Sequence, residues 1–136
     1  MASKLDSLSE RSSRRIASLG RRKYRERHEQ CIVEGVRGVR SALEAGAPVR
    51  ELVIEDSVRE GDEIARLIDR TDGSVSVSVC GPERFARLSD VENPQGVLAV
   101  VATQYRELED LASWERVLAL DAVQDPGNAG TLLRTA

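Results

Sequence analysis

The sequence predicts an α/β fold in which one sheet lies between two layers of helices. Between residues 30 and 102, short apolar runs alternate with segments of helical period, a pattern typical of a sheet covered by helices. Residues 95–101 are almost continuously apolar, as in a strand that is buried on both faces. A basic segment precedes this domain, and a different pattern follows it. We therefore expect a three-layer α-β-α domain over residues 30–102, preceded by a helical segment over 1–29.

Composition excludes several classes of protein. The chain has 136 residues, 40% of them hydrophobic, with a net charge of −3, which favours one folded domain over long-chain disorder. No stretch approaches the ~20 apolar residues of a membrane span, and residues 1–6 lack the apolar core of a secretory signal. Cys31 and Cys80 lack the spacing of metal ligands, and His28 is the single histidine. We expect a reduced, cytoplasmic protein without a metal.

The first 30 residues are basic, whereas the rest of the chain is acidic. Nine Lys or Arg stand against four acids over residues 1–30, a net of +5, and the other 106 residues carry a net of −8. A basic arm on an acidic body favours a polyanionic partner, although a solvated helix would show the same charges. The sparse apolar residues predict one long helix, or two helices broken at Gly20.

The strands and helices of the domain follow from periodicity and from Gly and Pro stops. The expected strands are 30–33, 51–54, 74–80 and 95–101, and the expected helices are 34–45, 61–70 and 82–88. In the strand over 74–80, valines should point one way and serines the other. Glu34 and Gly35 lie where a strand gives way to a helix, and both a capped junction and an RNA contact are consistent with them.

The chain ends in a pattern typical of a strand, a loop and a helix. Residues 103–115 are polar and acidic, as in a linker, and residues 116–120 are typical of a new buried strand. In the loop that follows, Gly127 can adopt a positive φ and Asn128 is a favourable N-cap. Arg134 lies four residues after Gly130, so its side chain can run back over the glycine toward the loop. A helix that ends with the chain predicts a second domain, over 116–136, that is truncated.

Four segments together resemble a known family. Residues 120–136 read LDAVQDPGNAGTLLRTA, and this run closely resembles the first conserved motif of the SpoU/TrmH-type RNA 2′-O-ribose methyltransferases of the SPOUT superfamily. The segments RRKYR at 21–25, IVEG at 32–35 and NPQGVLA at 93–99 resemble the start and the end of the family's N-terminal substrate-binding domain. That domain is similar in fold to certain ribosomal and kink-turn-binding RNA proteins.

The resemblance implies an activity for the parent protein and roles for individual residues. In this family S-adenosylmethionine methylates a ribose 2′-hydroxyl of rRNA or tRNA. Arg134 would act at the hydroxyl and the neighbouring phosphate, and Asn128 would position the same region. The residues that hold the cofactor belong to later motifs that are absent here, so this chain alone should bind no cofactor and be inactive. The family resemblance also implies a homodimer for the parent protein, while composition and cysteine spacing give the expectation of no membrane and no metal.

Charge and aromatic content suggest how the chain would recognise RNA. The expected phosphate contacts are Arg21, Arg22, Lys23, Arg25 and Arg27, which favour structured RNA read by its shape. Phe, Tyr and Trp make up only 3% of the chain, so a stacking platform for unpaired bases is not expected. Two alternatives remain. The chain could be a stand-alone structured-RNA-binding module without catalysis. It could also be a protein-interaction adaptor that uses the basic helix, in which case its affinity for RNA would be weak and equal to that for any polyanion.

Overall fold

The computed structural model describes residues 5–136, which form two compact units. The first unit is Met1–Gln104 and the second is Tyr105–Ala136. The described part of residues 1–29 therefore folds together with residues 30–102 as one unit. Each unit is built from its own sequence pattern and is described by itself.

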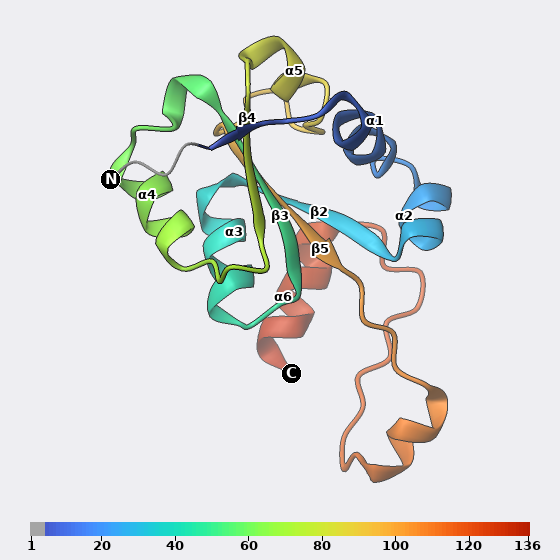
Figure 1. The fold of residues 1–136 in the computed structure, drawn as a ribbon. Coiled ribbons are helices and arrows are strands. Elements are labelled where there is room, and N and C mark those ends of the chain that lie inside the picture. The colour runs from blue at the N-terminus through green and yellow to red at the C-terminus, as the bar shows by residue number, and fades with distance from the viewer. Residues whose placement is uncertain (1–4) are drawn as a thin grey trace. The chain divides into compact units, whose positions relative to one another are not determined.

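The first unit is built around a mixed five-stranded sheet in the order β1-β4-β3-β5-β2 (Figure 1). The strands are β1 (Asp6–Ser7), β2 (Gln30–Glu34), β3 (Val49–Glu55), β4 (Ser76–Cys80) and β5 (Val97–Ala102). β3 pairs with β4 in parallel and with β5 antiparallel, and β5 also pairs antiparallel with β2. The four strands expected between residues 30 and 102 are all present in the sheet.

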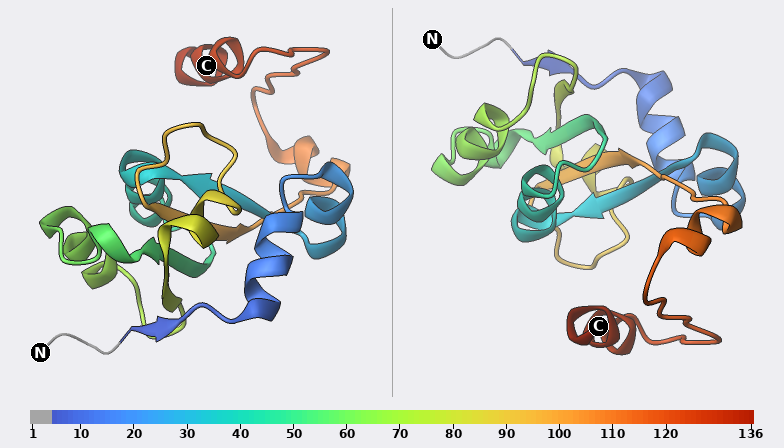
Figure 2. Two further views of the ribbon diagram at one scale, coloured as in Figure 1. Left: turned by 90° about the horizontal axis from the view of Figure 1, so that it is seen from above. Right: turned by 90° about the horizontal axis from the view of Figure 1, so that it is seen from below.

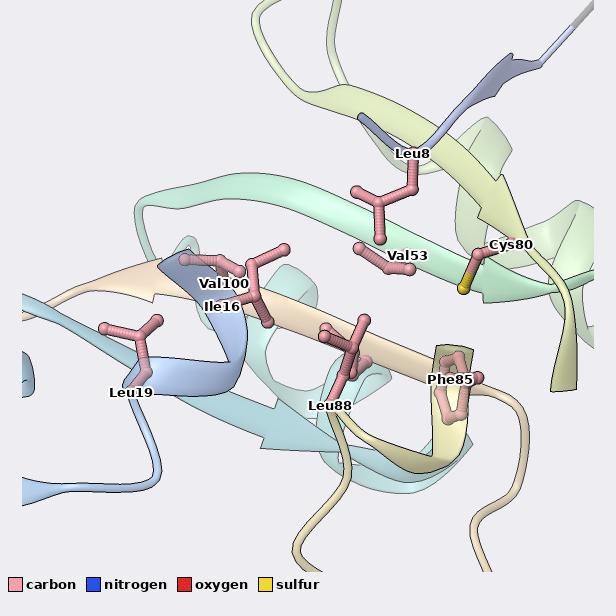
Figure 3. Close-up of a cluster of buried hydrophobic side chains, with 9 residues drawn as sticks. Leu8, Ile16, Leu19, Val53, Cys80, Phe85, Leu88 and Val100 are labelled. Carbon is pink, nitrogen blue, oxygen red and sulfur yellow. The ribbon is translucent and has the colours of Figure 1, made fainter. Parts of the chain in front are cut away.

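One face of the sheet is covered by α1 (Glu10–Ser18) and α5 (Pro82–Ala86) (Figures 1 and 2). The buried side chains between these helices and the sheet form a hydrophobic cluster, the α1/α5 cluster, shown in Figure 3. Ile16 and Leu19 come from the α1 region, and Phe85 and Leu88 come from the α5 region. All four side chains are at most 2% exposed. Because α1 contributes fully buried side chains, the basic N-terminal segment is part of the core rather than an appended arm.

The other face is covered by α3 (Gly35–Glu44) and α4 (Asp62–Asp69) (Figure 2). Val39 of α3 and Ile64 and Leu67 of α4 are buried against the sheet, as the helical spacing predicts. Residues 97–101 of β5 are all buried, which confirms the expectation of a strand covered on both faces. A helix layer on each face makes the first unit three-layered.

The N-terminal segment contains two helices, which is one of the two expected arrangements. It also contains a strand that the sequence did not predict. α1 ends at Ser18 and α2 (Arg22–His28) follows after Gly20, so the break at the glycine is confirmed. Before α1, β1 pairs in parallel with β4, and the Leu8 amide donates to the Val79 carbonyl at 2.8 Å. A strand of two residues is too short to show a period. Leu8 is thus buried by the strand and not by a helix stripe.

In β4 the alternation predicts the faces correctly but not the exposure. Val75, Val77 and Val79 pack against the cluster of buried residues under α3 and α4, as expected. The opposite face is covered as well, because α1 and α5 lie over it. Ser78 is therefore buried, at 8% exposure, and Cys80 belongs to the α1/α5 cluster.

The second unit contains the 3₁₀ helix η2 (Leu108–Ser113) and the helix α6 (Pro126–Thr135). The strand expected at residues 116–120 is wrong for this structure, because no described strand pairs with the segment. A strand needs a hydrogen-bonded neighbour, and apolar composition alone does not supply one. Val117, Leu118 and Leu120 are 56%, 47% and 41% exposed. The loop and helix that should follow the strand are present.

Candidate functional site

The basic residues expected to bind RNA lie on and just before α2, next to the start of β2 (Figure 1). The helix begins after Arg21, whose side chain makes no capping hydrogen bond, and it ends at Glu29 with φ of 50°. No residue of α2 is fully buried, but Tyr24 and Arg25 in the middle of this two-turn helix are half-buried. The helix presents its side chains along the edge of the first unit.

Arg25 differs from the other cations because its guanidinium is turned toward the end of α1. Its Nη1 donates to the carbonyl oxygens of Leu19 at 3.0 Å and Gly20 at 2.8 Å. These carbonyls lie at the C-terminus of α1, where helix carbonyls lack intrahelical partners and a cation is favourable. Of the five residues predicted to bind phosphate, Arg25 is thus the one that stabilises the corner between the two helices.

Lys23 and Arg27 form one exposed stripe on α2. They lie four residues apart, so they share a helix face. Among residues 5–136, neither side chain has an ion-pair or hydrogen-bond partner. Arg21 is also exposed at the start of the helix. Arg22 instead contacts Glu26 at 2.6 Å across one turn. The structure therefore brings Lys23 and Arg27 together and turns Arg25 away from them.

An aromatic pair on α2 was missed by the sequence analysis. The rings of Tyr24 and His28 are stacked, with centroids 6.4 Å apart and planes inclined by 15°. Tyr24 is half-buried and His28 is exposed. Counting only Phe, Tyr and Trp overlooks the imidazole, although the spacing of four residues was a usable signal.

Glu34 and Gly35 connect the strand β2 to the loop before β5. The Glu34 carboxylate accepts hydrogen bonds from the Ser89 hydroxyl at 2.6 Å and the Asp90 amide at 2.8 Å. Gln95 Oε1 accepts from the Val36 amide at 2.9 Å, at the first turn of α3. Two segments that resemble the family at opposite ends of the domain therefore meet here, and we call these contacts the Glu34 clasp.

In the second unit, α6 begins earlier than the sequence predicts. Asp125 is the N-cap, its carboxylate accepts from the Asn128 amide at 2.7 Å, and Pro126 occupies the first turn. The expectation that Asn128 caps the helix is wrong, because Asp125 is an equally favourable cap and Pro126 after it suits the first helical position, so the helix begins three residues earlier. Gly127 lies within the helix and does not have a positive φ.

Arg134 lies over Gly130, as the spacing predicts. A Cβ built at Gly130 would lie 3.2 Å from Arg134 Nη1, so the guanidinium lies in close contact with the bare face of the glycine. The same guanidinium donates from Nη2 to the Thr131 hydroxyl at 3.3 Å. Asn128 lines a hollow with Asp125 and Thr131 on this unit. The guanidinium is thus held near the first turns of α6.

The described residues do not fit an S-adenosylmethionine site. The hollow beside α6 has a volume of about 640 Å³ and is lined by residues 122–125, 128, 131 and 132, all of them exposed. Its carboxylate, Asp125, is occupied in capping the helix. A cofactor site needs convergent polar groups and close enclosure, and this surface offers neither. Among residues 5–136 there is also no cluster of potential metal ligands and no helix long and apolar enough to cross a membrane.

Curated relatives of the chain are named as RNA methyltransferases. It is 30% identical over 115 residues to the 23S rRNA (guanosine(2553)-2′-O)-methyltransferase RlmP of Bacillus subtilis, covering 85% of this chain and 42% of the relative. It is 34% identical over 123 residues to the 23S rRNA (uridine(2479)-2′-O)-methyltransferase of Streptomyces viridochromogenes, covering 88% and 42%. The chain thus spans less than half the length of these relatives.

Solved structures give the same relationship. The SpoU methyltransferase AviRb of Streptomyces viridochromogenes, crystallised with the cofactor AdoMet, matches with a TM-score of 0.64 and 26% identity, over 75% of this chain and 38% of AviRb. A putative RNA methyltransferase of the TrmH family from Porphyromonas gingivalis matches with a TM-score of 0.63 and 30% identity, over 94% and 47%.

The sequence profile of one family covers most of the first unit. It matches residues 11–99, from the first turn of α1 to the middle of β5. This range includes α2, the Glu34 clasp and both helix layers of the sheet. The chain therefore belongs to the family of MRM3-like substrate-binding domains, and its relatives are SpoU/TrmH-type RNA methyltransferases.

Proposed function

We propose that the chain is the RNA-recognising part of an S-adenosylmethionine-dependent ribose 2′-O-methyltransferase that acts on rRNA or tRNA. The family match over residues 11–99 supports the recognition role, and the names of the relatives support the reaction. The proposal includes a homodimer and a cytoplasmic location for the parent protein. It also holds that the chain alone transfers no methyl group, since no described residue fits the cofactor.

The observation that carries the catalytic part is the guanidinium of Arg134 lying over Gly130. A 2′-hydroxyl is a poor nucleophile until its proton is removed or the emerging oxyanion is stabilised. A guanidinium is planar and permanently charged, so it can hold the adjacent phosphate with two donors and stabilise the oxyanion. Gly130 leaves the space in which this side chain lies, and Asn128 orients the substrate from the same turn.

The recognition part rests on the cations of α2. Arg21, Lys23 and Arg27 are exposed, and together with Arg22 they present positive charge to phosphates along one short helix. The net charge of the chain is −3, so this attraction is local and does not come from the whole molecule. Arg25 is left out of the contact set because two carbonyls hold its guanidinium.

The reaction is tested in the full-length parent protein. Arg134→Lys should lower methyl transfer from radiolabelled S-adenosylmethionine to RNA by about 100- to 1,000-fold, because an ammonium lacks the rigid planar fork of donors that holds phosphate and oxyanion in a fixed geometry. Gly130→Ala should lower it by less, since the new Cβ would push the guanidinium away by only a few tenths of an ångström. Arg116→Lys is the matched control on an exposed arginine of the same unit. Full activity of Arg134→Lys would overturn the assignment.

RNA recognition is tested on the chain itself by titrating a structured RNA at several salt concentrations. Replacing Lys23 and Arg27 by Gln should reduce the slope of log affinity against log salt by about 1.4–1.8, because two phosphate contacts are lost. The control replaces Arg50 and Arg66 by Gln, which changes the net charge equally on β3 and α4. Equal slopes in the two double variants would contradict the proposed interface. RNA binding by a protein that never methylates would favour the stand-alone RNA-binding module.

A further inference from the structure

Side chains on α2 fall into stripes that differ in chemistry. Residues four apart share a face of a helix, and neighbouring stripes lie about 100° apart. Lys23 and Arg27 form the cationic stripe, and the stripe beside it carries Tyr24 and His28. Arg25 then follows on the far side of the aromatic stripe and is turned toward the end of α1. The aromatic stripe thus lies between the side chains that face the fold and those that face solvent.

The aromatic stripe presents one flat ring to solvent. Tyr24 is half-buried, and the exposed imidazole of His28 is stacked on it, with the ring planes inclined by 15°. With centroids 6.4 Å apart the two near-parallel rings are offset, and because the imidazole is exposed a further ring has room to stack on it beside the Tyr24 ring. A restrained flat surface loses little conformational entropy when another ring stacks on it.

The neighbouring charges identify which kind of ring this surface suits. Lys23 and Arg27 have no partners among the described residues and lie one stripe away, within reach of the groups that flank a bound ring. A nucleobase is a flat ring with negatively charged phosphates on both sides. Unpaired RNA bases are commonly bound by stacking on aromatic side chains, histidine included, with cations on the backbone.

We propose that His28, supported by Tyr24, stacks on one unpaired nucleobase of the RNA while Lys23 and Arg27 contact the adjoining phosphates. This inference rests on the proposed RNA-binding function of α2 and adds a substrate class to it. The bases of a continuous duplex are stacked on one another and have no free face. The surface therefore selects RNA that has a loop, a bulge or an extruded base next to a paired stem.

The experiment compares two RNAs of equal length, a hairpin with 2-aminopurine in its loop and a blunt duplex. The chain should bind the hairpin more tightly and change the 2-aminopurine fluorescence. His28→Leu keeps an apolar contact with Tyr24 but removes the flat ring, and it should weaken hairpin binding by about 5- to 100-fold. Its duplex affinity and its salt slope should match the wild type. His28→Phe restores a flat ring and should retain hairpin binding.

Other outcomes separate this inference from the function on which it rests. Replacing Lys23 and Arg27 by Gln should weaken hairpin and duplex alike, with a lower salt slope for both. If His28→Leu also weakens both RNAs equally, the pair only supports the helix and the stacking site is overturned. Equal wild-type affinity for the two RNAs would overturn it while leaving the RNA interface intact. If the wild type binds neither RNA, both proposals fall together.

Discussion

At the scale of single residues, the buried thiol of Cys80 makes the stability of the first unit depend on pH in the alkaline range. It ends β4, is 6% exposed, and packs in the cluster that contains Phe85 and Leu88. Burial raises the pKa of its thiol above the ordinary value of 9.0, with a smaller opposing effect from the charge of Arg84. In the unfolded chain the same thiol is solvated and ionises at its ordinary pKa.

A loss of stability at high pH follows from this difference. Because the folded pKa is the higher one, the contribution of Cys80 is fully present below pH 9 and is lost as the pH rises through the folded pKa. In urea unfolding at pH 7–10.5, the wild type should lose more free energy of unfolding on alkalinisation than Cys80→Ala. Cys31→Ala is the control, since the thiol of Cys31 in β2 is only half-buried. Parallel curves for wild type and Cys80→Ala would contradict the expectation.

The arginines of α2 show what a residue type cannot predict. Arg25 and Arg27 are two positions apart in one basic run, so the sequence assigns both to RNA. Their difference comes from carbonyls at Leu19 and Gly20, which lie where α1 ends. That position is set by how α1 packs on the sheet. By contrast, the placement of Arg134 over Gly130 depends only on a spacing of four within one helix, and it was predicted correctly.

At the scale of elements, the Glu34 clasp fixes the loop that leads into β5. The Glu34 carboxylate accepts hydrogen bonds from the Ser89 hydroxyl and the Asp90 amide, so the start of α3 and the loop after α5 are held together. Neither the strand nor the helix pattern could predict this contact. It joins residues 55 and 56 positions apart through a segment without regular structure.

Removing the clasp should destabilise the first unit. Glu34→Ala leaves two donors without their charged acceptor, which costs about 2 kcal/mol in the free energy of unfolding. Glu60→Ala, which removes only an exposed ion pair with Arg59, should stay within about 0.5 kcal/mol of the wild type. Both are measured by urea unfolding at pH 7. Equal stability of the two variants would show that Ser89 and Asp90 find other partners.

The elements that were predicted are those whose burial leaves a clear pattern along the chain. α3 and α4 each bury one helical face against the sheet, and β5 is a strand of that sheet and is covered on both faces. β1 has no period to detect, because it consists of Asp6 and Ser7 only. For residues 116–120 the composition is that of a strand, but a ladder depends on a neighbour that composition cannot reveal.

At the scale of the whole molecule, the core belongs entirely to the first unit. Both buried clusters are formed by residues between Leu5 and Val101, and no residue of the second unit belongs to either. The cations and the aromatic stripe of α2 lie in the first unit as well. The stability of this unit and its proposed RNA contacts therefore depend on residues up to Gln104.

A chain that ends at Gln104 should accordingly fold and recognise RNA. Its free energy of unfolding should lie within about 0.5 kcal/mol of that of the full chain, because no buried side chain is removed. It should bind the hairpin with the same affinity and salt slope. The measurements are urea unfolding and the salt titration used for α2. A shortened chain without a cooperative transition would show that the second unit is needed for folding.

The two-residue strand β1 also protects the protein against aggregation through the edge of its sheet. β4 has the sequence SVSVC, uncharged and rich in valine, which is the composition that pairs readily between chains. An outer strand of this kind is a template for aggregation when its amide and carbonyl groups are free. β1 lies along that edge at Ser78 and Val79 and places a charged Asp6 there. The basic N-terminal segment thus contributes to colloidal stability as well as to binding.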